Sequence, residues 1–316
     1  MNTAFVFPGQ GAQYVGMGKD LVDAVAVARE TIAEADDVLG FSLSRIIAAG
    51  PEEQLRLTYH TQPAILAVSV AALRALRELL DVRPRFVAGH SLGEYTALVA
   101  ADALAYADAL RLVRQRGFYM DAAVPAGVGG MAAVLGADLE LLRELCQRIS
   151  SELGATVEVA NVNCPGQVVV SGALVAVDEL IGRAAQAHAR RAIRLDVSGP
   201  FHSSLMSPAG ERLAHLLADV KIAQPSCPVI ANASAQPVDK PEEIRKALAR
   251  QVASPVLWEA SIRYMSDAGV TTYVELGPGA VLSGLVRKTE RQARTLQVDG
   301  VSSLQAALDA LRGGSA

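Results

Sequence analysis

A serine at position 91 lies in a short motif that is typical of a catalytic nucleophile. Residues 89–93 read GHSLG, which fits the pattern G-x-S-x-G, and they join an apolar run at 86–89 to a helical pattern at 92–100. The glycines of such a motif permit a sharp turn, and the serine is presented at a helix N-terminus, where free N–H groups favour developing negative charge. The other interpretation is a serine that caps a helix between two packing glycines. The position between strand and helix favours a nucleophile that accepts an acyl group.

A serine hydroxyl needs a base within hydrogen-bond reach before it can attack a carbonyl carbon. The chain has five histidines: His60, His90, His188, His202 and His215. His90 is adjacent to Ser91 in the turn, so its side chain should diverge, and the histidines at 188 and 215 lie in charged helical segments that we expect in solvent. His202 lies in a Gly-Pro loop before a helical pattern, and such loops commonly carry catalytic groups. His202 is the candidate base, and an ordinary loop histidine is the equal alternative from the residues alone.

The composition excludes several other classes of function. The 33 acidic residues outnumber the 29 basic ones, so there is no general basic face for nucleic acid. The N-terminus lacks a signal-peptide pattern and the apolar segments meet arginine before they reach membrane-spanning length, which predicts a cytoplasmic protein that does not enter the membrane. Cys146, Cys164 and Cys227 have neither disulfide nor metal-ligand spacing, and the histidines form no pair, so we expect no metal.

Short apolar strands alternate with helices over much of the chain. The runs TAFVF and RFVAG each end in a glycine-rich turn, and helical patterns cover 62–80, 92–100 and 105–120, the first with Thr61 as its N-cap and Pro63 in its first turn. This alternation predicts an α/β fold with a parallel sheet that is covered by helices on both faces. The later run GPGAVLSG joins a strand to a helix, and a tight turn and an anion contact are equally good interpretations of it.

A different order of elements follows a glycine-rich joint near residue 127. The segment up to residue 196 reads strand, helix, strand, strand, helix, strand, which is the ferredoxin-like βαββαβ arrangement. We therefore expect an inserted small domain at 127–196. The larger domain, with an α/β-hydrolase-like core, would then comprise 1–126 and 197–316, because the chain order of nucleophile before histidine suits such a site.

Nine motifs together carry a resemblance to a known family. In chain order they are FVFPGQGAQYVGMG, TQPAILA, AGHSLGEYTALVA, RLVRQRG, MAAVLG, NVNCPGQVVVSG, GPFHSSLM, RQVASPVLWEASI and ELGPGAVLSGL. From the N-terminus to about Lys288 the chain resembles the malonyl-CoA:acyl-carrier-protein transacylases of fatty-acid synthesis and the related acyltransferase domains of polyketide synthases. Several motifs in order are far more specific than the serine motif alone.

The resemblance implies a role for each of several residues. Ser91 and His202 would form a dyad, with the imidazole oriented by the main-chain carbonyl of Gln251 in place of an acidic side chain. The backbone N–H groups of Gln10 and Leu92 would form the oxyanion hole. Arg116, one of three arginines in RLVRQRG, would bind the free carboxylate of the malonyl group through two parallel charge-assisted hydrogen bonds.

The implied reaction transfers malonyl from malonyl-CoA to the phosphopantetheine thiol of an acyl carrier protein through a malonyl-serine ester. Coenzyme A is then a substrate, and we expect no bound cofactor. Leu92 and Phe201 resemble the residues of malonyl-specific relatives, which implies discrimination against methylmalonyl. The alternatives are a free-standing polyketide acyltransferase, the malonyl transferase of malonate decarboxylation, an acyl hydrolase and an inactive carrier-docking module.

An anionic carrier approaching an acidic protein needs a local basic patch near the cleft. The run HARRAIR at the end of the inserted domain is the best candidate, with Arg190 and Arg194 on one face of a strand and Arg191 on the other. Ordinary solvated arginines are an equally good interpretation.

Overall fold

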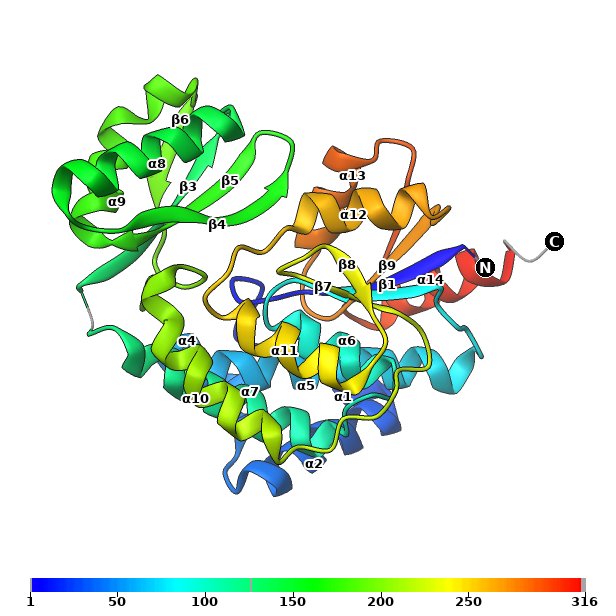
Figure 1. Ribbon diagram of the computed structural model, residues 1–316. Helices are drawn as coiled ribbons and strands as arrows, with labels where there is room; N and C mark the ends of the chain where they lie inside the picture. Colours follow the sequence, from blue (N-terminus) through cyan, green and yellow to red (C-terminus); the bar gives the residue numbers. More distant parts are fainter. Residues whose placement is uncertain (1, 126, 314–316) are drawn as a thin grey trace.

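The computed structural model describes residues 2–125 and 127–313, and a six-stranded sheet lies at its centre (Figure 1). Across the sheet the order is β10 (Arg294–Val298), β9 (Thr272–Leu276), β1 (Thr3–Phe7), β2 (Phe86–Gly89), β7 (Val229–Ala231) and β8 (Gln236–Val238). The strands from β10 to β7 are parallel, and β8 pairs antiparallel with β7 at one edge. This confirms the predicted α/β class with a largely parallel sheet.

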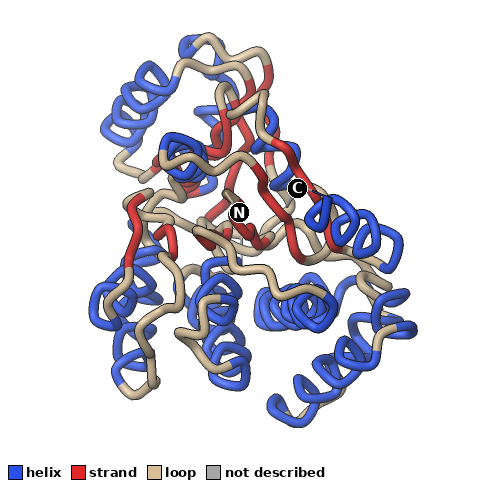
Figure 2. The backbone as a smooth tube through the Cα atoms, turned by 90° about the vertical axis from the view of Figure 1, so that its right-hand side faces the viewer, coloured by secondary structure: helices blue, strands red, loops and turns tan. Residues whose placement is uncertain are grey.

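Helices cover both faces of this sheet (Figure 2). The helices of the large body are α1 (Lys19–Ala24), α2 (Ala26–Leu39), α3 (Leu43–Ala49), α4 (Glu52–Arg56), α5 (Thr58–Leu79), α6 (Gly93–Ala100), α7 (Tyr106–Ala123), α10 (Ser207–Ala218), α11 (Pro241–Gln251), α12 (Trp258–Asp267), α13 (Val281–Thr289) and α14 (Val301–Gly313). Successive side chains of β1 point to opposite faces, so Phe5 and Phe7 join a core cluster with α5, α6 and α7. Ala4 and Val6 join a second cluster with α12 and α13.

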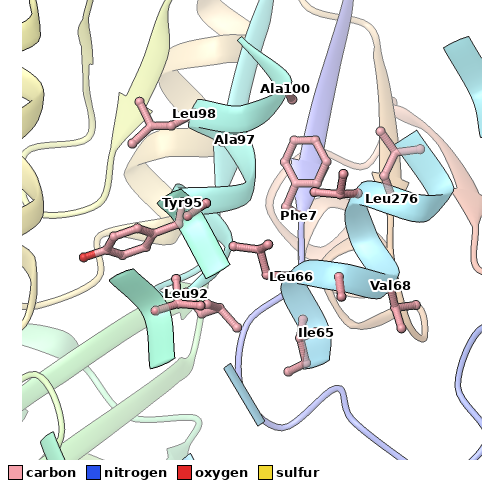
Figure 3. Packing of buried hydrophobic residues seen from close by; sticks show 14 of the residues in the cluster. Phe7, Ile65, Leu66, Val68, Leu92, Tyr95, Ala97, Leu98, Ala100 and Leu276 are labelled. Atoms are coloured by element: carbon pink, nitrogen blue, oxygen red, sulfur yellow. The ribbon is translucent and has the colours of Figure 1, made fainter. Parts of the chain in front are cut away.

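The larger of the two clusters holds the segment after β2 in place. Figure 3 shows Leu66 of α5 on the side of Phe7 of β1, and Leu98 of α6 belongs to the same cluster; all three side chains are buried. Helix α5 is apolar around most of its circumference, which is the pattern of a helix surrounded by protein. The N-terminus of α6 is thereby fixed directly beside the carboxyl end of the sheet.

The predicted start of the helical segment at 62–80 needs correction. Helix α5 begins at Thr58, not at residue 62, so Pro63 lies inside it and Thr61 is not its N-cap. The carbonyl of Leu57 accepts the first helical N–H bonds, and the Thr61 hydroxyl donates instead to the Leu55 carbonyl at 2.5 Å. A proline in the second turn removes one backbone donor, and tertiary packing stabilises the helix despite this loss.

The run GPGAVLSG forms the turn between β9 and α13. The carboxylate of Glu275, at the end of β9, accepts from the backbone N–H groups of Leu282 and Ser283 at 2.9 and 2.7 Å. An acidic side chain of the protein therefore already binds the helix N-terminus, which favours the tight-turn interpretation over an external anion.

The segment that follows α7 and precedes α10 in the sequence forms a small antiparallel sheet with two helices. Its elements are β3 (Gly129–Leu135), α8 (Leu139–Leu153), β4 (Val157–Cys164), β5 (Gln167–Ala173), α9 (Leu174–Arg183) and β6 (Arg191–Arg194), with strand order β4-β5-β3-β6. This is the ferredoxin-like βαββαβ arrangement that the sequence predicts. The exact limits, 127–196, remain a prediction.

The small sheet contacts the large body along β4. The N–H of Val162 donates to the Val256 carbonyl, and the N–H of Val256 donates to the Ala160 carbonyl, both at 2.9 Å. On the face away from α8 and α9, Met131 and Val169 join the core cluster of the large body. The two parts thus share hydrogen bonds and core.

Candidate active site

Residues 89–93 form a sharp turn between β2 and α6, as the motif predicts for a nucleophile elbow. Ser91 has a φ of 50°, in the left-handed region that non-glycine residues rarely adopt. A Cβ on Gly89 would lie 1.9 Å from the Gly93 carbonyl, so only glycine permits this close approach. The Asn232 side chain holds the turn: its Oδ1 accepts from Ser91 N at 2.6 Å and its Nδ2 donates to the Gly89 carbonyl at 2.7 Å.

The structure brings Ser91 and His202 together. The distance from Ser91 Oγ to His202 Nε2 is 2.7 Å, and His202 Nδ1 lies 3.0 Å from the main-chain carbonyl of Gln251. A carbonyl only accepts, so Nδ1 carries the proton and Nε2 is free to accept the serine proton. Burial, and then the nearby charge of Arg116, lower the pKa of His202 to about 3, so the imidazole is neutral at neutral pH.

The loop after β1 passes beside the elbow. His90 N donates to the Phe7 carbonyl at 3.0 Å, and a Cβ on Gly9 would lie 2.3 Å from the His90 carbonyl, so glycine is required at this crossing. This brings the backbone of Gln10 close to the turn. Neither Gln10 N nor Leu92 N has a hydrogen-bond partner within the described residues, which leaves both N–H groups free for an oxyanion.

The side chain of Arg116 is 1 % exposed and lies beside the nucleophile. Its Nη2 donates to Ser91 Oγ at 3.1 Å and to Gln251 Oε1 at 3.0 Å, and its Nη1 donates to Gln62 Oε1 at 2.8 Å. All of these acceptors are neutral. The guanidinium is therefore oriented toward the serine without a carboxylate bound to it in the part of the chain that the structure describes.

Sequence reasoning missed four contributors to this site. They are Gln62, Glu94, Asn232 and the side chain of Gln251, all buried. Glu94 Oε2 accepts from Asn232 N at 2.9 Å and from Gln251 Nε2 at 2.8 Å. Burial raises the pKa of Glu94 to about 7, while these hydrogen bonds and the charge of Arg116 oppose that rise. A polar residue inside an otherwise apolar helix, such as Gln62 in TQPAILA, is the one sequence signal that could have identified part of this group.

The remaining histidines do not contact the dyad. His90 Nε2 lies 2.8 Å from Asn163 Oδ1, and His60 Nδ1 lies 2.9 Å from the Gln54 carbonyl. His188 and His215 are exposed, as the sequence predicts. His90 therefore connects the elbow to β4 of the small sheet and does not serve Ser91 as a base.

The predicted basic patch is divided between two faces. Arg191 lies opposite Leu135 in the β6–β3 ladder, on the same face as Met131, which packs against the large body. Arg194 lies on the other face and pairs with Asp178 of α9. Arg190 is exposed beside Gly136. A contact of Arg190 or Arg194 with a carrier protein remains a prediction.

The described residues show no other candidate centre. They contain no group of His, Cys, Asp or Glu side chains that could hold a metal ion, and none of their helices is long and apolar enough to cross a membrane. Cys146, Cys164 and Cys227 are free thiols.

Comparisons with known proteins agree with this geometry. The family model for the acyl transferase domain matches residues 4–307. The malonyl CoA-acyl carrier protein transacylase of Bacillus subtilis (strain 168) is 47 % identical over 309 residues, which is 98 % of this chain and 97 % of the relative. The crystal structure of an acyl-carrier-protein S-malonyltransferase from Burkholderia pseudomallei 1710b has a TM-score of 0.95 at 45 % identity, covering 98 % of this chain and 100 % of that one.

A further solved structure shows a malonyl-transacylase in complex with a type II PKS acyl-carrier protein. It has a TM-score of 0.95 at 41 % identity and covers 98 % of this chain and 99 % of that one. The matches to these three proteins extend over nearly the whole length of both chains. The chain therefore belongs to the acyl transferase domain family, among the malonyl CoA-acyl carrier protein transacylases.

Proposed function

We propose that this protein transfers a malonyl group from malonyl-CoA to the phosphopantetheine thiol of an acyl carrier protein, through an ester on Ser91. The observation that carries the proposal is a buried guanidinium, Arg116, that lies 3.1 Å from the serine hydroxyl and has only neutral acceptors. A guanidinium binds a carboxylate through two parallel charge-assisted hydrogen bonds, so this arrangement fits an acyl group that carries its own carboxylate. The names of the relatives point to the same donor and acceptor.

The first half-reaction forms the malonyl-serine ester. Ser91 Oγ attacks the thioester carbon while its proton passes to His202 Nε2, and the N–H groups of Gln10 and Leu92 stabilise the oxyanion. The tetrahedral intermediate then expels the thiolate of coenzyme A, which takes the proton from His202. His202 is neutral again, and its Nδ1–H still donates to the Gln251 carbonyl.

The second half-reaction repeats these steps with a different thiol. The carrier's phosphopantetheine thiol gives its proton to His202 Nε2 and attacks the ester carbon, and Ser91 leaves with that proton. Because one site serves both thiols in turn, the kinetics should be ping-pong. The same chemistry would serve a free-standing polyketide acyltransferase. We propose fatty-acid synthesis as the pathway because the motifs of this chain resemble those of the transacylases of fatty-acid synthesis.

Replacing Arg116 with alanine should lower the specificity constant for malonyl-CoA and spare acetyl-CoA. The variant leaves the malonyl carboxylate unpaired in a buried site, which costs several kcal/mol, or roughly 10²- to 10³-fold. Acetyl has no carboxylate, so its specificity constant should stay within about threefold or rise. The measurement is kcat/KM for both donors with a phosphopantetheine-bearing carrier protein as acceptor.

The exposed arginine of the same helix provides a matched control. Arg111 pairs with Asp108 on the surface of α7, so Arg111→Ala should change neither specificity constant by more than about threefold. An equal fall for malonyl and acetyl in the Arg116 variant would make that residue structural. Rapid release of free malonate by the parent without any carrier would identify a hydrolase instead.

A preference for malonyl over methylmalonyl is expected from two buried side chains beside the dyad. Phe201 is 5 % exposed and Leu92 is 1 % exposed, so an added α-methyl group would meet packed atoms. We expect a preference of about 10- to 100-fold in kcat/KM, which is the usual cost of overpacking. The Phe201→Ala variant should reduce this preference, and equal specificity constants in the parent would contradict the assignment.

We further propose that the protein acts in the cytoplasm. The free thiols of its three cysteines fit a reducing compartment.

A further inference from the structure

Gln251 contacts each part of the candidate site, through both its main chain and its side chain. Its main-chain carbonyl accepts from His202 Nδ1 at 3.0 Å, and its Oε1 accepts from Arg116 Nη2 at 3.0 Å. Its Nε2 donates to the Ser91 carbonyl and to Glu94 Oε2, both at 2.8 Å. The residue is 1 % exposed, so these partners satisfy it in place of water.

The polarity of this amide is determined by its neighbours. The Ser91 carbonyl can only accept, and Glu94 Oε2 is an acceptor because the backbone N–H of Asn232 donates to it, so Nε2 must face both. The guanidinium of Arg116 can only donate, so Oε1 must face it. If the amide were flipped, Oε1 would face the acceptors of Ser91 and Glu94, and Nε2 would face the donors of Arg116, so these hydrogen bonds would be lost. Glu94 therefore orients the Gln251 side chain, and the Gln251 oxygen in turn orients Arg116.

This chain of contacts places one neutral amide between the buried carboxyl group of Glu94 and the buried guanidinium of Arg116. A direct ion pair between a buried carboxylate and a buried guanidinium would be strong in the low dielectric of the interior. A substrate carboxylate would then have to displace the protein's own. Because the acceptors of Arg116 are the amide oxygens of Gln62 and Gln251 and a hydroxyl, the guanidinium is held in position while its charge stays available.

We infer that Gln251 is a specificity-determining and positioning residue: its neutral side chain keeps the Glu94 carboxylate one amide away from Arg116, so that Arg116 binds the substrate's carboxylate and not the protein's. This inference rests on the proposed function. It assigns to the Gln251 side chain a role that is separate from the orientation of His202 by the main-chain carbonyl, which any residue at 251 can provide.

The test replaces the amide with a carboxylate of the same shape. Gln251→Glu presents a permanent counter-ion to Arg116, so kcat/KM for malonyl-CoA should fall by roughly 10- to 100-fold, the range of one hydrogen bond to a charged group. The value for acetyl-CoA should stay within about threefold, because acetyl does not use Arg116. The ratio of the two specificity constants is the measured quantity, since a merely structural role would lower both.

Two further variants separate the effect of the new carboxylate on donor specificity from its effect on the stability of the protein. In Gln251→Glu the new carboxylate faces Glu94, so the protein could lose stability; the double variant Glu94→Gln with Gln251→Glu removes that repulsion and keeps the carboxylate against Arg116. The double variant should fold and show the same loss of malonyl preference. Glu94→Gln alone leaves position 251 neutral, so it should change the malonyl and acetyl constants by the same factor.

The possible results are distinct. A malonyl-to-acetyl ratio in Gln251→Glu and in the double variant that equals the parent's would overturn the inference, and so would an equal fall for both donors. If the parent itself does not prefer malonyl over acetyl, the proposed function fails, whatever the variants do.

Discussion

Replacing Ser91 with alanine should abolish covalent labelling of the protein by malonyl-CoA. The mass of the intact parent protein should increase by one malonyl group when the carrier is absent, because the ester is then the end of the reaction. Ser91 is the only serine whose Oγ lies at hydrogen-bond distance from His202 within the described residues. The alanine variant keeps the backbone contacts with Asn232 and Gln251, so the fold should be retained.

A neighbouring serine provides the control for this experiment. Ser203 is buried in the same loop as His202, and its hydroxyl donates to the Pro200 carbonyl at 2.7 Å. Ser203→Ala should still gain one malonyl group. Undiminished labelling of a folded Ser91→Ala variant would exclude Ser91 as the nucleophile and, with it, the proposed mechanism.

Replacing His202 with alanine should slow both half-reactions by roughly 10²- to 10⁴-fold, the usual range for general acid-base assistance. The same Nε2 accepts the proton of the serine in the first half-reaction and that of the carrier thiol in the second. Burial lowers the pKa of His202 to about 3, so above about pH 5 the imidazole is neutral and can act as the base. The neutral form is lost only as the pH falls toward about 3. Quenched-flow measurement of acyl-enzyme formation and of its discharge to the carrier gives the two rates.

A second histidine tests whether the loss is specific. His60 lies on α5 with its Nδ1 next to the Gln54 carbonyl and makes no contact with the dyad. His60→Ala should therefore retain both rates within about threefold. Near-normal rates in His202→Ala would place the base elsewhere, and slowing of only one half-reaction would show that the two thiols do not share it.

The nucleophile could be predicted from the sequence because its environment is local. The strand, turn and helix that present Ser91 are contiguous, and the crowding that requires glycine at 89 comes from Gly93 in the same turn. The crowding at Gly93 is different, because it comes from the backbone of Phe7 and Pro8. The alternation of strands and helices likewise predicted a covered parallel sheet, and the inserted βαββαβ order was readable from the period of its apolar residues. The short antiparallel β8 and the helices α1 to α4 were not predicted, although α2 buries Ala28, Thr31, Ile32 and Ala35 at helical spacing.

The partners of Ser91 depend on contacts between residues that are distant in the chain. His202 is 111 residues from Ser91. From the residues alone, a catalytic base and an ordinary loop histidine were equally good interpretations of it. Arg116 was selected from three nearby arginines only through the family resemblance, and the structure shows the physical difference: Arg111 is exposed and Arg116 is buried against Ser91.

The Gln251 side chain was not predicted at all. Its importance comes from the Glu94 carboxylate on one side and the Arg116 guanidinium on the other, which lie 157 and 135 residues away in the chain. An amide has no distinctive sequence signal, since the same residue type is common on any surface. The sequence by itself thus determined the nucleophile and the class of fold, because these follow from short-range pattern; only the tertiary structure decided which distant polar groups lose their water and bind one another, because burial and partner choice arise when the chain packs.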